Sequence, residues 1–179
     1  AAATNLNQIA ESMKQIETTL TQQRTNRTTQ QAAKAVKDTV ADLRETYPTA
    51  SISVSENVEL WIPVTDAFHY ALSHAIENAI VHAESPEPTV DITIDTSPNT
   101  GRVEIRIDDE GPPIPDAELD ALDEQAKTTP THHGSGCGLF VMKWCIETLG
   151  GELRIEPADC CGNSVFFYLP PQTPADTDT

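Results

Sequence analysis

A column of polar side chains follows one helix that the sequence predicts over residues 66–83. Apolar residues recur there at three- and four-residue spacing, which gives the helix one buried stripe. Beside the stripe His74, Asn78 and His82 follow one another at four-residue intervals, next to Glu77. An amide and two imidazoles at the border of a buried face suit the binding of a polar ligand. The alternative interpretation is that these side chains are simply solvated on a surface helix.

Three glycines, Gly134, Gly136 and Gly138, precede a second apolar-periodic helix that begins at Leu139. The unpaired N–H groups and the dipole of a helix N-terminus favour an anion, and glycine lets a phosphate approach the backbone closely. The spacing GxGxGL is not the dinucleotide fingerprint, and no Lys-Ser/Thr pair follows as in a P-loop. The turn therefore predicts another kind of anion site or, taken alone, a tight connection.

The segment Asp109–Pro115 reads DEGPPIP and cannot continue a strand, because its prolines donate no hydrogen bonds. We therefore expect the strand before it to end at Asp109, with this carboxylate at the rim of a sheet. Residues 116–133 are acidic, poor in apolar side chains and interrupted by Pro130. We interpret them as a mobile lid, with at most a short helix in the first half.

The elements that must position these residues are predicted from periodicity. A period of two indicates strands. The predicted strands are residues 51–55, 59–64, 89–96, 102–109, 152–156 and 163–169. Pro63 demotes the second of them toward a sheet edge, and the turn SPNTG joins the third and fourth into a hairpin. A helical stretch from Ala33 to Leu43 ends at Tyr47, before Pro48.

A further helix is predicted over residues 3–23, with a heptad-like apolar seam that needs a partner helix. The seam consists of Leu6, Ile9, Met13, Ile16 and Leu20. It fails at residues 24–30, where Arg24 and Arg27 occupy seam positions, so we expect a break there.

The net charge of the chain is −17 at pH 7, and residues 46–179 hold 23 of the 28 acidic but only 5 of the 11 basic side chains. Such a field excludes nucleic acid as a partner and suits solubility in concentrated salt. The sequence contains neither a run of 18 apolar residues nor a secretory signal. Its four cysteines lack the spacing of a zinc site or a disulfide framework. We therefore expect a cytoplasmic location.

Taken in this order, the motifs resemble the ATP-binding catalytic domain of two-component sensor histidine kinases, whose superfamily includes gyrase B, the heat-shock chaperone of ninety kilodaltons and MutL. Residues 74–83 are similar to the N box of that family, residues 109–115 to its first glycine box and residues 134–139 to its second. The resemblance implies an α/β (α+β) two-layer sandwich, the Bergerat-type fold, in which helices cover one face of a mixed, mostly antiparallel sheet. Together with the acidity, the sequence resembles such kinases of halophilic archaea.

The resemblance also gives the N-terminal seam a role. Residues 3–23 look like the second helix of the hairpin through which such kinases form homodimers and present their phosphoacceptor histidine. Residues 1–68 contain no histidine, so we expect the acceptor to lie upstream or in trans. The implied organisation is a helical segment with a linker (1–30), a catalytic domain (31–171) and a disordered tail (172–179). Any membrane association would depend on regions upstream.

The ligands implied by the resemblance are ATP and Mg²⁺. Asn78 looks like the catalytic amide that ligates Mg²⁺, a hard cation suited to oxygen ligands. Asp109 looks like the carboxylate that accepts the adenine amino group, and Gly111 would let the chain approach the base. Lys127 is the candidate catalytic cation for the terminal phosphate. The other implied nucleotide contacts are His74, His82, Ile114, Gly134, Ser135, Gly136, Gly138 and Leu139.

Three residues depart from the family's pattern. His74 stands where many members carry a second asparagine, Val81 where many carry a basic residue, and Pro113 replaces the second glycine of the first glycine box. We expect a domain that transfers the γ-phosphoryl group of Mg·ATP to a histidine, from which a response regulator receives it. The alternatives are a degenerate module that binds nucleotide or dimerises and signals by conformation alone, and a serine-kinase relative that phosphorylates a partner protein.

Overall fold

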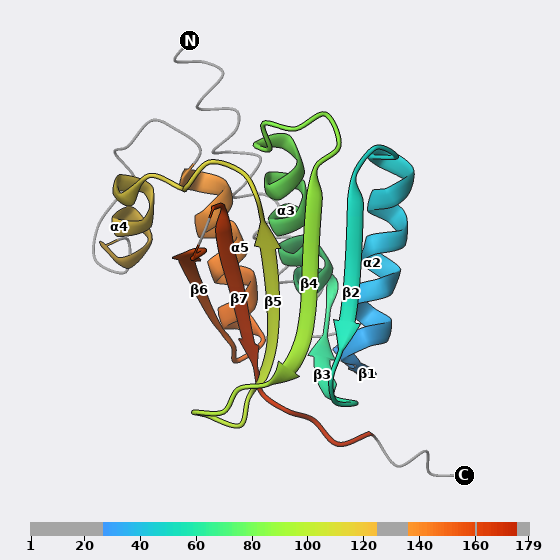
Figure 1. The fold of residues 1–179 in the computed structure, drawn as a ribbon. Helices are drawn as coiled ribbons and strands as arrows, with labels where there is room; N and C mark the ends of the chain where they lie inside the picture. The colour runs from blue at the N-terminus through green and yellow to red at the C-terminus, as the bar shows by residue number, and fades with distance from the viewer. Residues whose placement is uncertain (1–26, 125–135, 160, 175–179) are drawn as a thin grey trace.

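The computed structural model describes residues 27–124, 136–159 and 161–174 (Figure 1). The helix predicted over residues 3–23 lies outside the described residues, as do Lys127, Gly134 and Ser135. No helix in the described part of the chain is long and apolar enough to cross a membrane.

The main sheet has five strands, which are β2 (Ser51–Glu56), β4 (Thr89–Thr96), β5 (Val103–Asp109), β7 (Asn163–Leu169) and β6 (Glu152–Pro157). They lie in the order β2-β4-β5-β7-β6. β2 and β4 are parallel, and the other neighbouring pairs are antiparallel. One face of the sheet is covered by the helices α2 (Ala32–Thr46), α3 (Asp66–Val81) and α5 (Gly136–Thr148) (Figure 1). This arrangement confirms the predicted fold class.

Alternation along the strands decides which face the helices cover. In β4, Ile92 and Ile94 are buried while Asp91 is exposed. Ile92 pairs with Ile107 of β5, so apolar side chains of adjacent strands form one continuous surface beneath the helices. The sequence predicted this pattern correctly because each half-buried strand carries its own period of two.

The helix α3 begins at Asp66, directly after Thr65. The hydroxyl of Thr65 accepts a hydrogen bond from the N–H of Ala67 at 3.2 Å and caps the helix. Phe68, Leu72 and Ile76 are fully buried, which confirms the apolar stripe. The helix ends at Val81, slightly before its predicted end, and His82 is its C-cap residue.

A short helix, α4 (Asp116–Glu124), occupies the start of the segment that we interpreted as a lid, and most of the remainder lies outside the described residues. Lys143 of α5 donates a hydrogen bond to the carbonyl oxygen of Leu122 at 2.9 Å. Because the last carbonyls of a helix have no partner within it, this bond ties the end of α4 to α5.

A second sheet joins β1 (Thr28–Gln31) to β3 (Trp61–Val64) in antiparallel register. Pro63 lies opposite Thr29 in this two-stranded pair, which confirms the predicted edge position of β3. The sequence did not predict β1, because TTQQ has no apolar alternation and lies where we expected a break between helices. The sheet pairing therefore begins at Thr28, before the expected start of the domain at residue 31.

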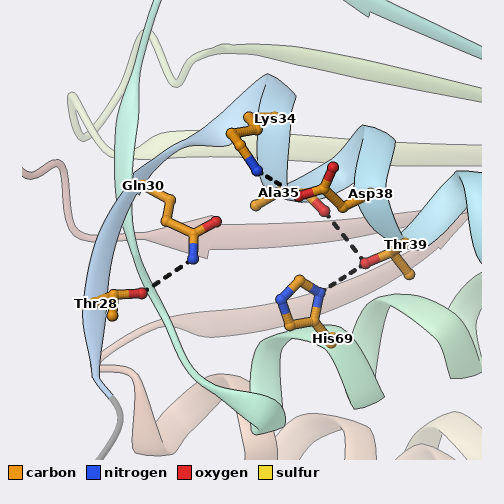
Figure 2. Close-up of polar contacts among 7 residues, drawn as sticks. All are labelled: Thr28, Gln30, Lys34, Ala35, Asp38, Thr39 and His69. Carbon is orange, nitrogen blue, oxygen red and sulfur yellow. Dashed lines mark hydrogen bonds and ion pairs between the residues drawn. The ribbon is translucent and has the colours of Figure 1, made fainter.

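Figure 2 shows the polar contact that joins α2 to α3. Thr39 of α2 is buried, and its hydroxyl donates a hydrogen bond to the carbonyl oxygen of Ala35 at 3.2 Å. The same hydroxyl oxygen lies 2.8 Å from Nδ1 of His69 on α3. The other polar contacts in this view are exposed, namely Lys34–Asp38 at 2.7 Å and Gln30–Thr28 at 3.0 Å.

Candidate functional site

The polar column of α3 is in contact with the start of α5 through His74. If Gly138 carried a Cβ atom, that atom would lie 2.8 Å from Cε1 of His74 and still closer to Nε2. The imidazole ring therefore rests against the backbone of the first turn of α5, where only glycine leaves room for it. The ring of Tyr70 is stacked on this imidazole, with ring centroids 6.0 Å apart and an angle of 4° between the ring planes. Burial lowers the pKa of His74 below 6.5, so the ring is neutral at pH 7.

The C-terminal end of the same column meets the first glycine box. Gly111 is buried, and a Cβ atom there would lie 3.3 Å from the carbonyl oxygen of His82. The imidazole side chain of His82 itself is exposed. Residues 74 and 82 are about 12 Å apart along the helix axis. One helix thus contacts the glycine-rich start of α5 at His74 and the loop after β5 at His82.

Asn78 lies midway between these two contacts, one turn of α3 from each histidine. Its side chain is half-buried and forms no hydrogen bond with another described residue, whereas its carbonyl oxygen accepts the N–H of His82 at 3.1 Å. As far as the described residues go, the amide oxygen is available to a ligand. The described residues contain no group of three or more His, Cys, Asp or Glu side chains that could enclose a metal ion. The single amide oxygen of Asn78 fits Mg²⁺, because this cation keeps several waters and is commonly shared with substrate phosphates.

The Asp109 carboxylate at the end of β5 is held by one of its two oxygens. Oδ1 accepts hydrogen bonds from the N–H of Gly111 at 2.9 Å, from the N–H of Asn163 at 3.2 Å and from Nδ2 of Asn163 at 3.3 Å. No described residue donates a hydrogen bond to Oδ2. The half-buried carboxylate thus has one anchored oxygen and one that can accept a proton donor from a ligand.

The residue that sequence reasoning missed at this site is Asn163. It is 5% exposed and bonds to the loop 110–114 as well as to Asp109. Gly162, directly before it, has φ +87° and passes against the Asp109 backbone. The sequence offers a Gly-Asn pair before a strand as the only signal, and it does not say which strand lies beside β7.

The glycine-rich turn differs in detail from its prediction. α5 begins at Gly136, so Gly136 and Gly138 belong to its first turn rather than to a loop before it. The N–H groups of this turn have no partner within the helix and can bind an anion. The side chain of Leu139 is buried in the core, so its only polar contribution to such a site is its N–H group. Ile114 is half-buried in the loop after β5.

All these segments meet at one end of the domain, the upper end in Figure 1, where α3 ends, α5 begins, β5 ends and β7 begins. These features define the class of molecule. It is an α/β sandwich with a carboxylate acceptor, an amide that has no partner among the described residues, and a helix N-terminus, all at one end of its sheet. The family of histidine kinase-, DNA gyrase B- and HSP90-like ATPases matches residues 63–173. The chain belongs to this family.

Individual relatives agree with this assignment. Over 99 residues the chain is 28% identical to the sensor histidine kinase DcuS of Escherichia coli K12. This aligned stretch is 55% of this chain and 18% of that protein. Over 132 residues it is 26% identical to the sensor-type histidine kinase PrrB of Mycobacterium tuberculosis H37Rv. This aligned stretch is 72% of this chain and 29% of that protein. The chain therefore spans less than a third of either relative. The solved structure of the mycobacterial sensor histidine kinase MprB has the same fold, with a TM-score of 0.66, 21% identity and coverage of 82% of this chain and 99% of that one.

Proposed function

We propose that this chain is the catalytic domain of a sensor histidine kinase, which binds Mg·ATP and transfers the γ-phosphoryl group to a histidine. The observation that carries the proposal is the Oδ2 atom of Asp109, to which no described residue donates a hydrogen bond. It belongs to the site where the polar column of α3 reaches the loop after β5. A family of ATPases and an acceptor suited to the amino group of adenine point to the same ligand.

Within this proposal the nucleotide follows α3 from His82 toward His74. Adenine lies beside Asp109 and Gly111, where Oδ2 accepts its 6-amino group, and Ile114 and His82 flank the base. Guanine carries a carbonyl oxygen at that position and is rejected, because two acceptors cannot pair. The phosphates lie at the first turn of α5, where Gly136, Gly138 and Leu139 offer N–H groups.

Mg²⁺ supplies charge neutralisation at the phosphates, and the Asn78 amide oxygen would be its ligand from this chain. We propose that Gly134 and Ser135 extend the phosphate cradle and that Lys127 reaches the terminal phosphate. His74, neutral and packed on Gly138, fixes the distance between α3 and α5. The domain then acts through positioning and electrostatics, with little covalent chemistry of its own.

The remaining parts of the proposal concern the whole protein. The phosphoacceptor histidine lies outside residues 1–68, on a helix upstream or in trans, and a response regulator receives the phosphoryl group. The residues before Thr28 contribute to homodimerisation and linkage. The catalytic domain runs from Thr28, where β1 pairs with β3, to Gln172, whose N–H donates to the carbonyl oxygen of Trp61, and the residues after it are a tail. We further propose a cytoplasmic location, with any membrane attachment upstream, and a halophilic archaeal origin, which the net charge of −17 supports.

Calorimetric titration of the chain with ADP, a non-hydrolysable ATP analogue and GTP tests the proposal. Each nucleotide is added with and without Mg²⁺, in dilute and in multimolar KCl. We expect adenine-selective, Mg²⁺-sensitive binding with a Kd roughly between micromolar and sub-millimolar values. Absence of binding by any nucleotide, from a chain that circular dichroism shows to be folded, would contradict it.

A degenerate module that binds nucleotide without phosphotransfer is favoured by one observation. Val81 is 64% exposed beside the proposed site, where a basic side chain would offer a phosphate contact. The two functions differ in phosphotransfer from labelled ATP to a longer version of the protein that includes the acceptor histidine. Normal nucleotide affinity without a labelled histidine would establish the degenerate module.

A further inference from the structure

Asn163 occupies a special place in the sheet. It is the first residue of β7, and because Asp108 pairs with Ser164, it lies beside Asp109 where β5 ends. The two residues are 54 positions apart in the chain, and Asn163 is 5% exposed. A buried carboxamide at such a position must find partners for both its NH₂ group and its oxygen.

The carboxamide satisfies this requirement with three different partners. Nδ2 donates to the carbonyl oxygen of Pro112 at 2.9 Å and to Oδ1 of Asp109 at 3.3 Å, while Oδ1 of Asn163 accepts the N–H of Ile114 at 2.8 Å. The orientation of the amide is unambiguous, because the flipped amide would set its NH₂ group against the N–H of Ile114. Asn163 therefore braces both the carboxylate and the loop 110–114 that follows it.

The consequence for Asp109 is a choice between its two oxygens. Two of the three donors on Oδ1 come from Asn163, one from its backbone and one from its side chain. The third is the N–H of Gly111, in the loop that the same carboxamide holds. The carboxylate cannot rotate without losing several of these bonds, so Oδ1 stays bound to the protein and Oδ2, to which no described residue donates, remains the acceptor for a ligand.

We propose that Asn163 is the positioning residue that makes this site selective for a purine with a 6-amino group. The inference rests on the proposed nucleotide-binding function and extends it, because it assigns the selectivity to a residue outside the three recognised motifs. Asn163 acts through Asp109 and does not itself need to touch the base. Removal of its side chain takes away one of the three donors on Oδ1. It also releases the loop 110–114, in which Gly111 supplies a second donor, so only the backbone N–H of residue 163 keeps its position.

The test compares ATP with purine riboside 5′-triphosphate, which has hydrogen in place of the 6-amino group. Affinities of both are measured calorimetrically for the wild-type chain and for Asn163→Ala. We expect Asn163→Ala to weaken ATP binding about tenfold, the value of one or two hydrogen bonds, and to change the binding of purine riboside triphosphate by less than about twofold. The selectivity between the two ligands should therefore collapse.

Two further variants act through the same atoms. Asn163→Asp keeps the size of the side chain and its acceptor for Ile114, but loses both donated hydrogen bonds and places a second carboxylate beside Asp109. It should lose selectivity as Asn163→Ala does, and it remains informative if the alanine variant fails to fold. In an Asp109→Ala background, where the acceptor is gone, Asn163→Ala should leave the selectivity unchanged.

Asn57→Ala is the matched control, because Asn57 donates to Oδ2 of Asp95 at 2.8 Å in another asparagine–aspartate pair, exposed and toward the opposite end of β4. It should leave both affinities unchanged. Equal weakening of both ligands by Asn163→Ala would assign Asn163 a general structural role and overturn the proposal, as would unchanged affinities. Wild-type binding without preference for the amino group would overturn the placement of adenine at Asp109, and no binding at all would overturn the proposed function with it.

Discussion

Gly138→Ala is the substitution that most directly probes how α3 and α5 fit together. The new Cβ atom would lie 2.8 Å from Cε1 of His74 and closer to Nε2, whereas carbon atoms are in favourable contact at about 3.5–4.0 Å. Turning the ring away would break its stacking on Tyr70 and expose a half-buried side chain, so the movement has a cost. Either the ring or the first turn of α5 must therefore shift.

Two contributions of opposite sign set the magnitude. Overpacking of a well-filled site costs about 1–3 kcal/mol. Alanine in a helix is more favourable than glycine by up to about 1 kcal/mol, and the first turn of α5 gains less than that. We expect Gly138→Ala to lower the free energy of unfolding by about 1–2 kcal/mol. In a His74→Ala background the clash is absent, so the same substitution should be neutral or slightly stabilising.

Urea denaturation of four proteins, the wild type, both single variants and the double variant, measures this coupling, which should amount to about 1–3 kcal/mol. Gly101→Ala is the control, because a Cβ atom at Gly101 would meet nothing within 4 Å. Its effect should be the same with and without His74. If Gly138→Ala destabilises both backgrounds equally, the reasoning is refuted and the cost belongs to the backbone of α5 alone.

Three further predictions follow from the site. Asn78→Ala should remove the Mg²⁺ dependence of nucleotide binding in calorimetric titrations, and a retained dependence would place the metal ligand elsewhere. Burial lowers the pKa of His74 below 6.5, so the unfolded chain binds this proton first, and the free energy of unfolding should fall as the pH drops from 6.5 toward the lowered pKa. His74→Gln should flatten that part of a pH series of urea denaturations, and an unchanged slope would contradict the assignment. Gly162→Ala should cost about 2–4 kcal/mol, because its φ is +87° and the new Cβ atom would lie 2.6 Å from the carbonyl carbon of Asp109. Gly101→Ala, with φ +69° in open space, should lower the free energy of unfolding by only about 1–2 kcal/mol. Equal losses for the two variants would show that crowding at Gly162 contributes nothing.

The sequence predicted those elements whose own residues determine their burial. The strand over residues 89–96 was found with its observed bounds because Val90, Ile92 and Ile94 alternate with polar residues. α3 was found from its apolar stripe. β1 was missed because nothing in the sequence of Thr28–Gln31 indicates a strand. This strand forms because β3 provides an edge with which it can pair. Local patterns cannot reveal an element that depends on a partner about 30 residues away.

The same distinction holds within the site. Asp109 stood out because it is a polar residue at the end of an apolar strand. Asn78 stood out because it is a polar residue at the border of the apolar face of a helix. Asn163 did not stand out, because its partner is 54 residues away and only the pairing of β5 with β7 brings the two together. The contact of His74 with Gly138 was equally hidden, since the sequence predicted glycine for phosphate approach and not for packing.

The register of β1 on β3 gives the domain a mechanical polarity. Thr28 pairs with Val64, next to the Thr65 cap of α3, whereas Gln31 pairs with Trp61 at the other end of the ladder. A load applied to the chain just before Thr28 would open the rungs one at a time, and the first rung to yield is the one beside α3. Such a load would therefore act on the N-terminal end of α3, the helix that leads to His74, Asn78 and His82, before it acts on any strand of the main sheet.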